Sequence, residues 1–196
     1  VFLFSDNVTI EEELELKKYA EEQGLLVMGP GCGTAIINGV GLAFANVVKK
    51  GPVGIVAAAG PGLQEVSTLL SNAGVGVSHG FGTGGMDLSD KIGGITAKQC
   101  LRILEEDPET EVIVLISKPP GPNTAQELSK YLVRMRKPVV LNFIGLSSTI
   151  EGGDKVFITK TLEGAALRAV SLIRNEAFQE KVFTEEMSKV LQLAES

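Results

Sequence analysis

Short apolar runs alternate along the chain with amphipathic segments that are long enough for helices. Five of these runs are too short for helices and predict buried strands at 53–59, 75–79, 112–117, 138–144 and 156–159. Helices are expected between and after them, over about 61–72, 96–106, 122–136 and 161–174. Strands that alternate with helices in this way predict an α/β fold, in which a doubly wound parallel sheet of the flavodoxin-like type is covered on both faces.

The first 46 residues predict a separate βαβ unit. Apolar runs at 1–4 and 25–28 are expected to be strands, and a helix is expected between them at 10–23. A glycine-rich connection then leads into the rest of the chain. The predicted organisation is a βαβ unit in 1–46, a flavodoxin-like domain in 51–174 and a terminal helix in 175–196. Because the chain starts inside a strand-like run without a Met, we expect it to be part of a larger protein.

Two of the expected helices begin with a capping signal. Thr9 and Glu12 have capping-box spacing before the first helix, and Thr96 and Gln99 have the same spacing at the helix expected near 96–106. In a capping box, the two side chains satisfy backbone N–H groups that the helix itself leaves unpaired. Both helices are therefore expected to be capped by their own residues.

Charge and cysteine usage narrow the classes of partner. The 196 residues carry 24 acidic and 18 basic side chains, a net charge of −6, without a cluster of lysine and arginine. Binding to nucleic acid needs such a cluster and a membrane span needs a long apolar run, so neither partner is expected. Cys32 and Cys100 lie far apart and the chain has one histidine, so no structural zinc site is expected and no metal ligand is assigned. A reducing, cytoplasmic location fits this composition.

Four loops that follow predicted strands are rich in glycine or proline. In a doubly wound sheet, ligands lie outside the carboxyl ends of the strands, where glycine lets N–H groups approach an anion. We therefore expect a phosphate-bearing ligand at this edge, bound by the helices after Gly60 and Gly94, although glycine also serves tight turns alone. The candidate phosphate and substrate contacts are Gly31, Cys32, Gly33, Gly60, Pro61, Gly62, Gly82, Thr83, Gly84, Gly85, Gly93, Gly94 and Lys118.

Four side chains near these loops are candidates for chemistry. His79 is expected at the end of a strand, where it could act as a nucleophile or transfer a proton. Glu65 could be a base or could orient a partner group, so these two are the catalytic candidates. Cys32 could be an activated thiol and Lys118 a phosphate contact. The structural alternatives are a backbone-bonded histidine, a solvated acid, an inert buried thiol and a surface lysine.

Common nucleotide-binding motifs do not occur in the chain. Neither GxxxxGK[ST] nor GxGxxG in a strand-to-helix context is found, which excludes ATP or dinucleotide binding by those motifs. A flavin is disfavoured because the only aromatic residues are eight Phe and two Tyr. Asp87 and Asp90 could hold Mg²⁺ together with a substrate phosphate, although capping and turn roles are more common for aspartates beside glycine.

Five segments carry a family resemblance. They read MGPGCGTAIING (28–39), GIVAAAGPGLQEV (54–66), VSHGFGTGG (77–85), DLSDKIGG (87–94) and DPETEVIVLISKPP (107–120). Together they resemble the FdrA proteins, a family of acyl-CoA synthetase-like proteins, and more distantly they are similar to the alpha subunit of succinyl-CoA synthetase. The resemblance implies that 1–46 is the end of a Rossmann-like CoA-binding domain and that 51–174 is a CoA-ligase domain.

The resemblance also implies an activity. FdrA-type proteins are associated with bacterial allantoin breakdown, as a subunit of an oxamate carbamoyltransferase complex that interconverts oxalurate with oxamate and carbamoyl phosphate. Phosphate is then a substrate, and the expected partners are a carbamoyl or acyl phosphate or a CoA thioester and other protein subunits. No cofactor is assigned to this chain, and CoA or a nucleotide would bind through regions outside it. The alternatives are a non-catalytic ligase-like partner subunit and a true acyl-CoA ligase.

Departures from the synthetase argue against a histidine relay. The synthetase has a phosphohistidine after the strand that matches 138–144, where this chain reads GLSSTIEGGDK (145–155). The Ser-Gly-Thr loop that would hold the phosphohistidine becomes Ala-Gly-Pro at 59–61, and His79 aligns with an ordinary strand-end residue. The resemblance therefore predicts acyl-phosphate chemistry without a phosphohistidine.

Overall fold

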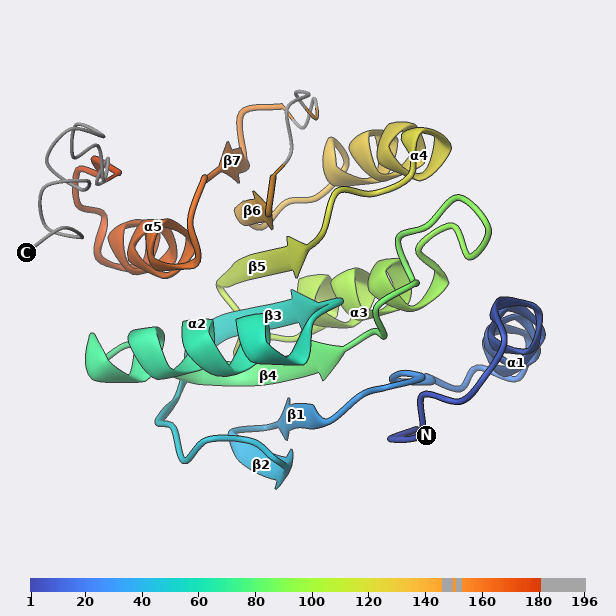
Figure 1. The fold of residues 1–196 in the computed structure, drawn as a ribbon. Helices are drawn as coiled ribbons and strands as arrows, with labels where there is room; N and C mark the ends of the chain where they lie inside the picture. The colour runs from blue at the N-terminus through green and yellow to red at the C-terminus, as the bar shows by residue number, and fades with distance from the viewer. Residues whose placement is uncertain (146–149, 151–152, 181–196) are drawn as a thin grey trace, which may run out of the picture.

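Seven strands form one sheet in the order β2-β1-β4-β3-β5-β6-β7 (Figure 1). The computed structural model describes residues 1–145, 150 and 153–180. The parallel strands are β3 (Lys50–Ala57), β4 (Val77–Gly82), β5 (Val112–Ser117), β6 (Val139–Phe143) and β7 (Val156–Ile158). Ranked by chain order, these strands lie 2-1-3-4-5 across the sheet, which is the flavodoxin-like order. The predicted α/β fold is confirmed.

Helices cover both faces of this sheet (Figure 1). One face carries α2 (Gly60–Asn72) and α5 (Leu162–Arg174), the other carries α3 (Ile95–Glu106) and α4 (Pro122–Leu132), and α1 (Ile10–Glu22) packs beside α3. In β5, Ile113 and Leu115 are buried toward α3 and α4, whereas Val114 and Ile116 are buried toward α2 and α5. A strand buried on both sides is apolar at every position, which is why its sequence does not alternate.

The glycine-rich connection expected at 29–41 contains an antiparallel hairpin instead. Its strands are β1 (Thr34–Ile37) and β2 (Val40–Ala43), and β1 also pairs antiparallel with β4. Asn38 and Gly39 form the turn with φ values of 53° and 77°. Left-handed backbone at both positions is the signature of a type I′ turn, for which Asn-Gly is the favoured pair. The sheet is therefore extended by two antiparallel strands that the sequence analysis missed.

The first residues form less regular structure than expected. The runs at 1–4 and 25–28 meet in one parallel bridge between Phe2 and Met28. Two backbone hydrogen bonds support it, from Leu3 N–H to Met28 O and from Met28 N–H to Val1 O, both at 2.9 Å. Met28 belongs to the same apolar cluster as α3 and α4, so this segment is packed on the sheet that follows it.

The two expected capping boxes have different outcomes. The box at α1 is confirmed, because Thr9 Oγ1 accepts from the N–H of Glu12 (3.3 Å) and Glu12 Oε2 accepts from the N–H of Thr9 (2.8 Å). The expected box of Thr96 and Gln99 is wrong. No side chain of the helix itself caps α3, and the Thr96 hydroxyl donates to the carbonyl of Val27 at 3.0 Å.

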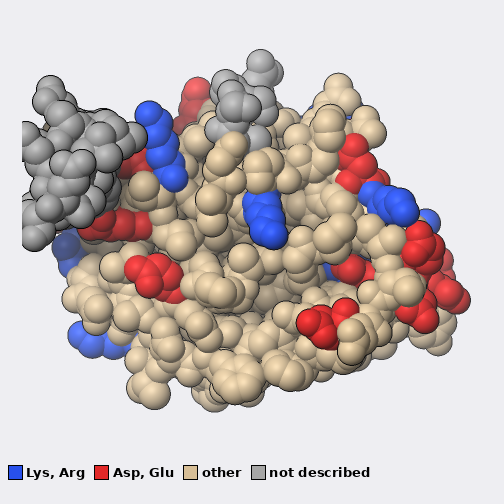
Figure 2. Space-filling model, viewed as in Figure 1, with Lys and Arg blue, Asp and Glu red and all other residues tan. Residues whose placement is uncertain are grey.

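Charged side chains are scattered over the face of the molecule viewed in Figure 2, where acidic groups gather on the side of α1. Glu11, Glu12 and Glu13 form the first turn of that helix. Within the described residues, no helix is long and apolar enough to cross a membrane. Most of the helix expected in 175–196 lies outside the described residues.

Candidate functional site

Two glycine-rich loops pack directly against each other at the carboxyl edge of the sheet. A Cβ on Gly82 would overlap the side chain of Cys32, and a Cβ on Gly84 would lie 2.8 Å from the carbonyl oxygen of Pro30. Gly84 also has a φ of 90°, which a residue with a side chain rarely adopts. Glycine at these two positions therefore serves the close approach of the loop after β4 to the loop at 29–34.

The loop after β3 joins the same group. Gln64 of α2 donates from Nε2 to Thr34 Oγ1 (3.1 Å) and to the carbonyl of Phe44 (2.7 Å). A Cβ on Gly60 would lie 4.0 Å from Thr34 Oγ1, and a Cβ on Gly85 would lie 3.9 Å from the carbonyl oxygen of Ala58. A Cβ at either glycine would thus make only ordinary van der Waals contact, unlike one at Gly82 or Gly84.

The N-terminus of α2 presents unpaired backbone N–H groups at the carboxyl edge of the sheet. The first helical hydrogen bond is donated by Leu63 to the Ala59 carbonyl (3.2 Å), and no side chain caps the helix. The N–H groups of Gly60 and Gly62 precede that bond, while Pro61 has none. Strand order reverses between β3 and β5, and ligands of open α/β sheets bind outside such a switch point. The uncapped N-terminus of α2 follows β3 and therefore lies on the β3 side of this switch point.

A buried ion cluster underlies the loop after β4. Lys17 of α1 is 1% exposed, and its Nζ donates to Glu13 Oε1 (2.7 Å), Asp87 Oδ1 (2.8 Å) and the carbonyl of Thr83 (2.9 Å). Asp87 is itself fully buried. A buried charge needs paired and hydrogen-bonded partners, and all three donors of this ammonium have one. Figure 1 shows α1 on the side of the molecule to which β3 and β4 point.

The N-terminus of α3 is already occupied by a carboxylate. Asp87 accepts hydrogen bonds from the N–H groups of Thr96 (3.2 Å) and Ala97 (2.9 Å). The expectation that phosphate binds at the helix after Gly94 is therefore revised, because its N–H groups have a partner in the chain. Gly93 and Gly94 form the left-handed turn into this helix, with φ values of 71° and 69°.

Asp90 plays the same part at α4. It accepts from the N–H of Thr124 (2.9 Å) and from Nδ2 of Asn123 (3.2 Å). The hydrogen bond from the Thr124 N–H lowers the pKa of Asp90. The structure thus gives Asp87 and Asp90 capping roles, which was the commoner of the two uses expected for them.

His79 is not beside the glycine-rich loop. β4 continues to Gly82, so His79 lies within the strand, and its Nε2 is 3.6 Å from Oδ2 of Asp107, at the C-terminus of α3. Its Nδ1 accepts from the N–H of Asn38 at 3.1 Å, and its ring stacks on Phe81 with centroids 5.6 Å apart. The expected position at the strand end is wrong, and the histidine links the β1–β2 turn to the C-terminal end of α3, near the start of β4.

Both cysteine thiols are enclosed. Cys32 is 3% exposed, Cys100 is fully buried, and neither forms a disulfide. Burial raises the pKa of each thiol, and a backbone hydrogen bond to Thr34 lowers that of Cys32 only in part. Cys32 is therefore a packed thiol against Gly82, and nothing around it activates it.

The remaining two candidates are exposed. Glu65 lies on α2, one turn from its uncapped N-terminus, and Lys118 follows β5 at the other side of the switch point. Gly31 and Gly33 belong to the 29–34 loop, where Gly31 has a φ of 70°. The structure thus brings Glu65 and Lys118 to the carboxyl edge with the glycine loops and leaves His79 outside it.

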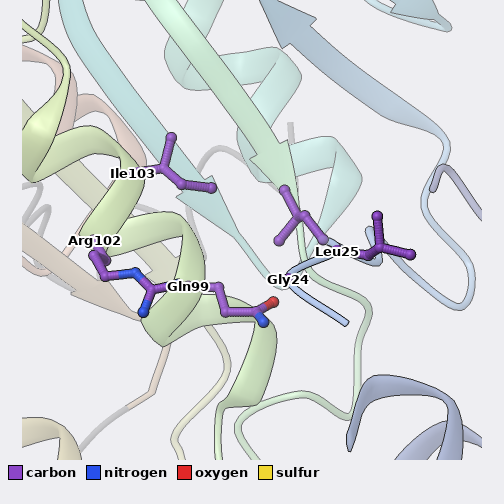
Figure 3. Close-up of a pocket in the computed structure, with 6 residues that line it drawn as sticks. Gly24, Leu25, Gln99, Arg102 and Ile103 are labelled. Atoms are coloured by element: carbon purple, nitrogen blue, oxygen red, sulfur yellow. The ribbon is translucent and has the colours of Figure 1, made fainter. Parts of the chain in front are cut away.

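A small pocket lies away from these loops, between the end of α1 and α3. Gly24, Leu25, Gln99, Arg102 and Ile103 line it, as Figure 3 shows. Its volume of about 50 Å³ has room for a few water molecules. It is too small for a nucleotide or for CoA, because ligand pockets usually measure several hundred Å³.

Three residues that organise the edge were missed from the sequence: Lys17, Thr34 and Gln64. A lysine in an amphipathic helix predicts a solvent-facing side chain, and its partners Thr83 and Asp87 are more than sixty residues away in the chain. The available signal was weak: Lys17 follows Glu13 by one helical turn, a spacing typical of an exposed ion pair.

Comparisons with known proteins agree with this architecture. No protein-family model matches the chain. It is 49% identical to YahF of Escherichia coli over 172 residues, which cover 88% of this chain and 33% of YahF. It is 29% identical to the malate–CoA ligase alpha subunit of Methylorubrum extorquens (68% of this chain, 45% of that protein). It is 26% identical to the succinate–CoA ligase alpha subunit of Methanothermobacter thermautotrophicus (93% and 65%).

Solved structures show the same fold. ATP citrate lyase from Methanothrix soehngenii, in complex with citrate and coenzyme A, matches with a TM-score of 0.68 at 15% identity, over all of this chain and 39% of that one. A dinucleotide-forming acetyl-coenzyme A synthetase from Ca. Korarchaeum cryptofilum, in complex with phosphate and ADP, matches with a TM-score of 0.64 at 17% identity (84% and 41%). The chain therefore resembles CoA-ligase alpha subunits, and it spans between a third and two thirds of the relatives compared here.

Proposed function

We propose that this chain is the ligase-like component of an enzyme complex that binds an acyl phosphate at the carboxyl edge of the sheet. The observation that carries the proposal is the uncapped start of α2, with the N–H groups of Gly60 and Gly62 ahead of the first helical hydrogen bond. Such a terminus favours an anion through its N–H groups and its partial positive charge. Thr34 and Lys118 supply a hydroxyl and a cation at the same edge.

The relatives support a ligase-like role. Several are alpha subunits of CoA ligases, so they act with partner subunits, and one structural neighbour was solved with phosphate. We carry the finer assignment from the FdrA resemblance: the complex is an oxamate carbamoyltransferase of allantoin breakdown, and carbamoyl phosphate is its acyl phosphate. CoA thioesters or nucleotides would bind through other parts of the complex.

The proposed chemistry needs no phosphohistidine. A phosphate oxygen attacks the ureido carbonyl carbon of oxalurate, the bond from that carbon to the oxamate nitrogen breaks, and the nitrogen takes up a proton. The phosphate carries negative charge before the attack, and charge develops on the carbonyl oxygen as the new bond forms; fixed N–H donors stabilise such charge. Gly60 and Gly62 would hold the phosphate, while the exposed carboxylate of Glu65 is the acid or base nearest to them along α2.

Calorimetric titration of the chain with phosphate and with carbamoyl phosphate tests the site. Gly60→Val is the sharpest variant, because a Cβ at this position meets only Thr34 Oγ1, at 4.0 Å, so the backbone there accepts a side chain. We expect it to weaken binding at least tenfold, with Gly60→Ala intermediate as the matched control and both melting temperatures near that of the wild type. Gly62→Val is less suitable, since a Cβ there would lie 2.9 Å from Ile116.

Two results would contradict the proposal. If neither phosphate nor carbamoyl phosphate gave heat on titration, the anion site would be ruled out and a non-catalytic partner subunit would be favoured. Acid-labile phosphate on the protein after incubation with ATP or GTP and Mg²⁺ would restore a histidine-relayed ligase, with His79 as the only histidine available. We expect no such labelling in the wild type or in His79→Asn, which keeps an acceptor for the Asn38 N–H.

A further inference from the structure

Lys17 holds both ends of one short loop. Its Nζ donates to the carbonyl of Thr83 at 2.9 Å and to Oδ1 of Asp87 at 2.8 Å, and these two residues begin and end the segment 83–87. The middle of the segment, Gly85 and Met86, is exposed at the carboxyl edge. A single ammonium group from α1 therefore forms hydrogen bonds to both ends of the glycine-rich loop after β4.

The ends of the segment have further partners, since the N–H of Thr83 donates to the carbonyl of Ala57 at 2.9 Å and the Asp87 carboxylate accepts from the N–H groups of Thr96 and Ala97, whereas its middle has few. Inside the segment, the N–H of Asp87 donates to the carbonyl of Gly84 at 3.3 Å, a long hydrogen bond. Gly84 has a left-handed φ of 90°, and Gly85 contributes no side chain to packing. Three residues with so few side-chain contacts would sample many backbone conformations unless their ends were fixed.

Stability alone does not account for a lysine here. Removing an ammonium group from water costs several kcal/mol, and a buried ion cluster can often be replaced by apolar side chains without loss of stability. A methionine of similar length at position 17 would avoid that cost. What the lysine adds, and methionine cannot, is one donor group that joins the Thr83 carbonyl to the Asp87 carboxylate, which the N–H groups of α3 hold from the other side.

We infer that Lys17 is a positioning residue of the anion site: it fixes the segment 83–87 so that the loop presents a preformed edge to the phosphate bound at α2. The inference rests on the proposed function. It makes α1 part of the site, although α1 lies in the segment whose resemblance is to a CoA-binding domain. Because the ion cluster already orders the loop in the free protein, less conformational entropy is lost when the anion binds.

The experiment separates positioning from stability. Lys17→Met leaves Glu13 and Asp87 buried without their cationic partner, so it is compared with the triple variant Glu13→Gln, Lys17→Met, Asp87→Asn, which removes the charges together and keeps one side-chain oxygen at position 87 for the N–H groups that start α3. Lys91→Met is the matched control. Lys91 pairs with Glu11, which lies on α1 as Lys17 does, but the side chain of Lys91 is 66% exposed. The full chain is measured for phosphate affinity by calorimetry, for melting temperature, and for ¹⁵N order parameters of Gly84, Gly85 and Met86.

We expect Lys17→Met to lower the melting temperature and the triple variant to regain part of it, because Asp87→Asn keeps only one of the two oxygens that accept from the start of α3. Both should bind phosphate at least tenfold more weakly than the wild type, with order parameters of the loop falling from about 0.85 toward 0.6. Recovery of affinity and order together with stability in the triple variant would overturn the inference. If the wild type itself binds no phosphate, the proposed function fails, and the order parameters still decide whether Lys17 holds the loop.

Discussion

Asp107 shows how a single carboxylate joins separate parts of the chain. Its Oδ2 accepts from the Thr110 hydroxyl at 2.5 Å and lies 3.6 Å from Nε2 of His79, and its Oδ1 accepts from the N–H of Glu109 at 3.2 Å. Partial burial raises the pKa of this carboxyl, but the Thr110 and Glu109 hydrogen bonds and the nearby histidine outweigh it. The net effect is a lowered pKa.

A depressed carboxyl pKa fixes the direction of a pH effect. The charged form of Asp107 is stabilised in the folded state, so its contribution is present above the unfolded pKa of about 3.9 and is lost as pH falls through the lower folded pKa. We expect Asp107→Asn to cost about 1–2 kcal/mol at pH 7. Urea unfolding of both proteins from pH 7 to pH 2 should show this difference shrinking below about pH 4. A difference that grows in acid would contradict the lowered pKa.

Thiol reactivity is a second prediction for single residues. Burial keeps both Cys32 and Cys100 protonated at neutral pH, and only the thiolate is nucleophilic. The native protein should therefore react with a disulfide reagent far more slowly than a small-molecule thiol does. As the control, denatured protein should react with two equivalents of the reagent per chain, one for each cysteine. Fast reaction of one thiol in the native state would reopen the possibility that Cys32 is activated.

What the sequence could show about single residues depended on the distance between partners. The box of Thr9 and Glu12 was predictable because both residues lie within one helical turn. The caps of α3 and α4 were not, since Asp87 and Asp90 reach helices that start 8 and 32 residues later in the chain. The sequence placed Thr96 correctly at a helix start, but it could not show that a distant carboxylate had taken the cap.

Among the elements, the turn that leads into β4 has glycine in left-handed backbone at two positions. Gly74 and Gly76 both have left-handed backbone, with φ values of 77° and 86°. A Cβ on Gly74 would meet nothing within 4 Å, whereas one on Gly76 would lie 2.6 Å from the carbonyl oxygen of Lys49. The two positions therefore separate backbone strain from steric overlap within one turn.

We expect Gly74→Ala to cost about 1–2 kcal/mol, the penalty of left-handed backbone with a Cβ. Gly76→Ala should cost a further 1–3 kcal/mol or so, because backbone must move to admit the methyl group. At about 2–4 °C per kcal/mol for a protein of this size, thermal melts should resolve the pair. Equal shifts for both variants would mean that the β3–β4 pairing adjusts freely around position 76.

The hairpin was missed although its turn carried a clear signal. Asn38-Gly39 between apolar residues is the strongest short-range indication of a two-residue β-turn. The glycines at 29–41 predicted a connecting loop instead, with phosphate contacts at Gly31 and Gly33, and the parallel pattern of the other strands does not extend to an antiparallel pair. The five parallel strands were predictable for the opposite reason, since burial on both faces leaves a continuous apolar run.

At the scale of the whole molecule, residues 1–46 are tied to the rest of the chain. Met28, Cys32 and Ala35 share an apolar cluster with β5, α3 and α4, and β1 pairs with β4. Lys17 adds a buried ion pair to Asp87. The proposed site draws on both segments as well: the sequence put the loops of Gly33 and Gly60 at the same edge, and the structure adds the position of Thr34 beside Gly60.

The last prediction therefore concerns the predicted boundary between 1–46 and 51–174. A chain that starts at residue 47 loses one edge of the sheet, part of one apolar cluster and the partner of Asp87, and breaking a buried ion pair alone costs about 3–5 kcal/mol. Domains are stable by only about 5–15 kcal/mol, so we expect this truncated chain to lack a cooperative melt by circular dichroism and to bind a hydrophobic dye. Adding Asp87→Asn to it should restore part of the lost stability. A truncated chain that melts cooperatively within a few degrees of the full chain would instead mean that 47–196 folds alone, and that residues 1–46 contribute to the site without being needed for the fold.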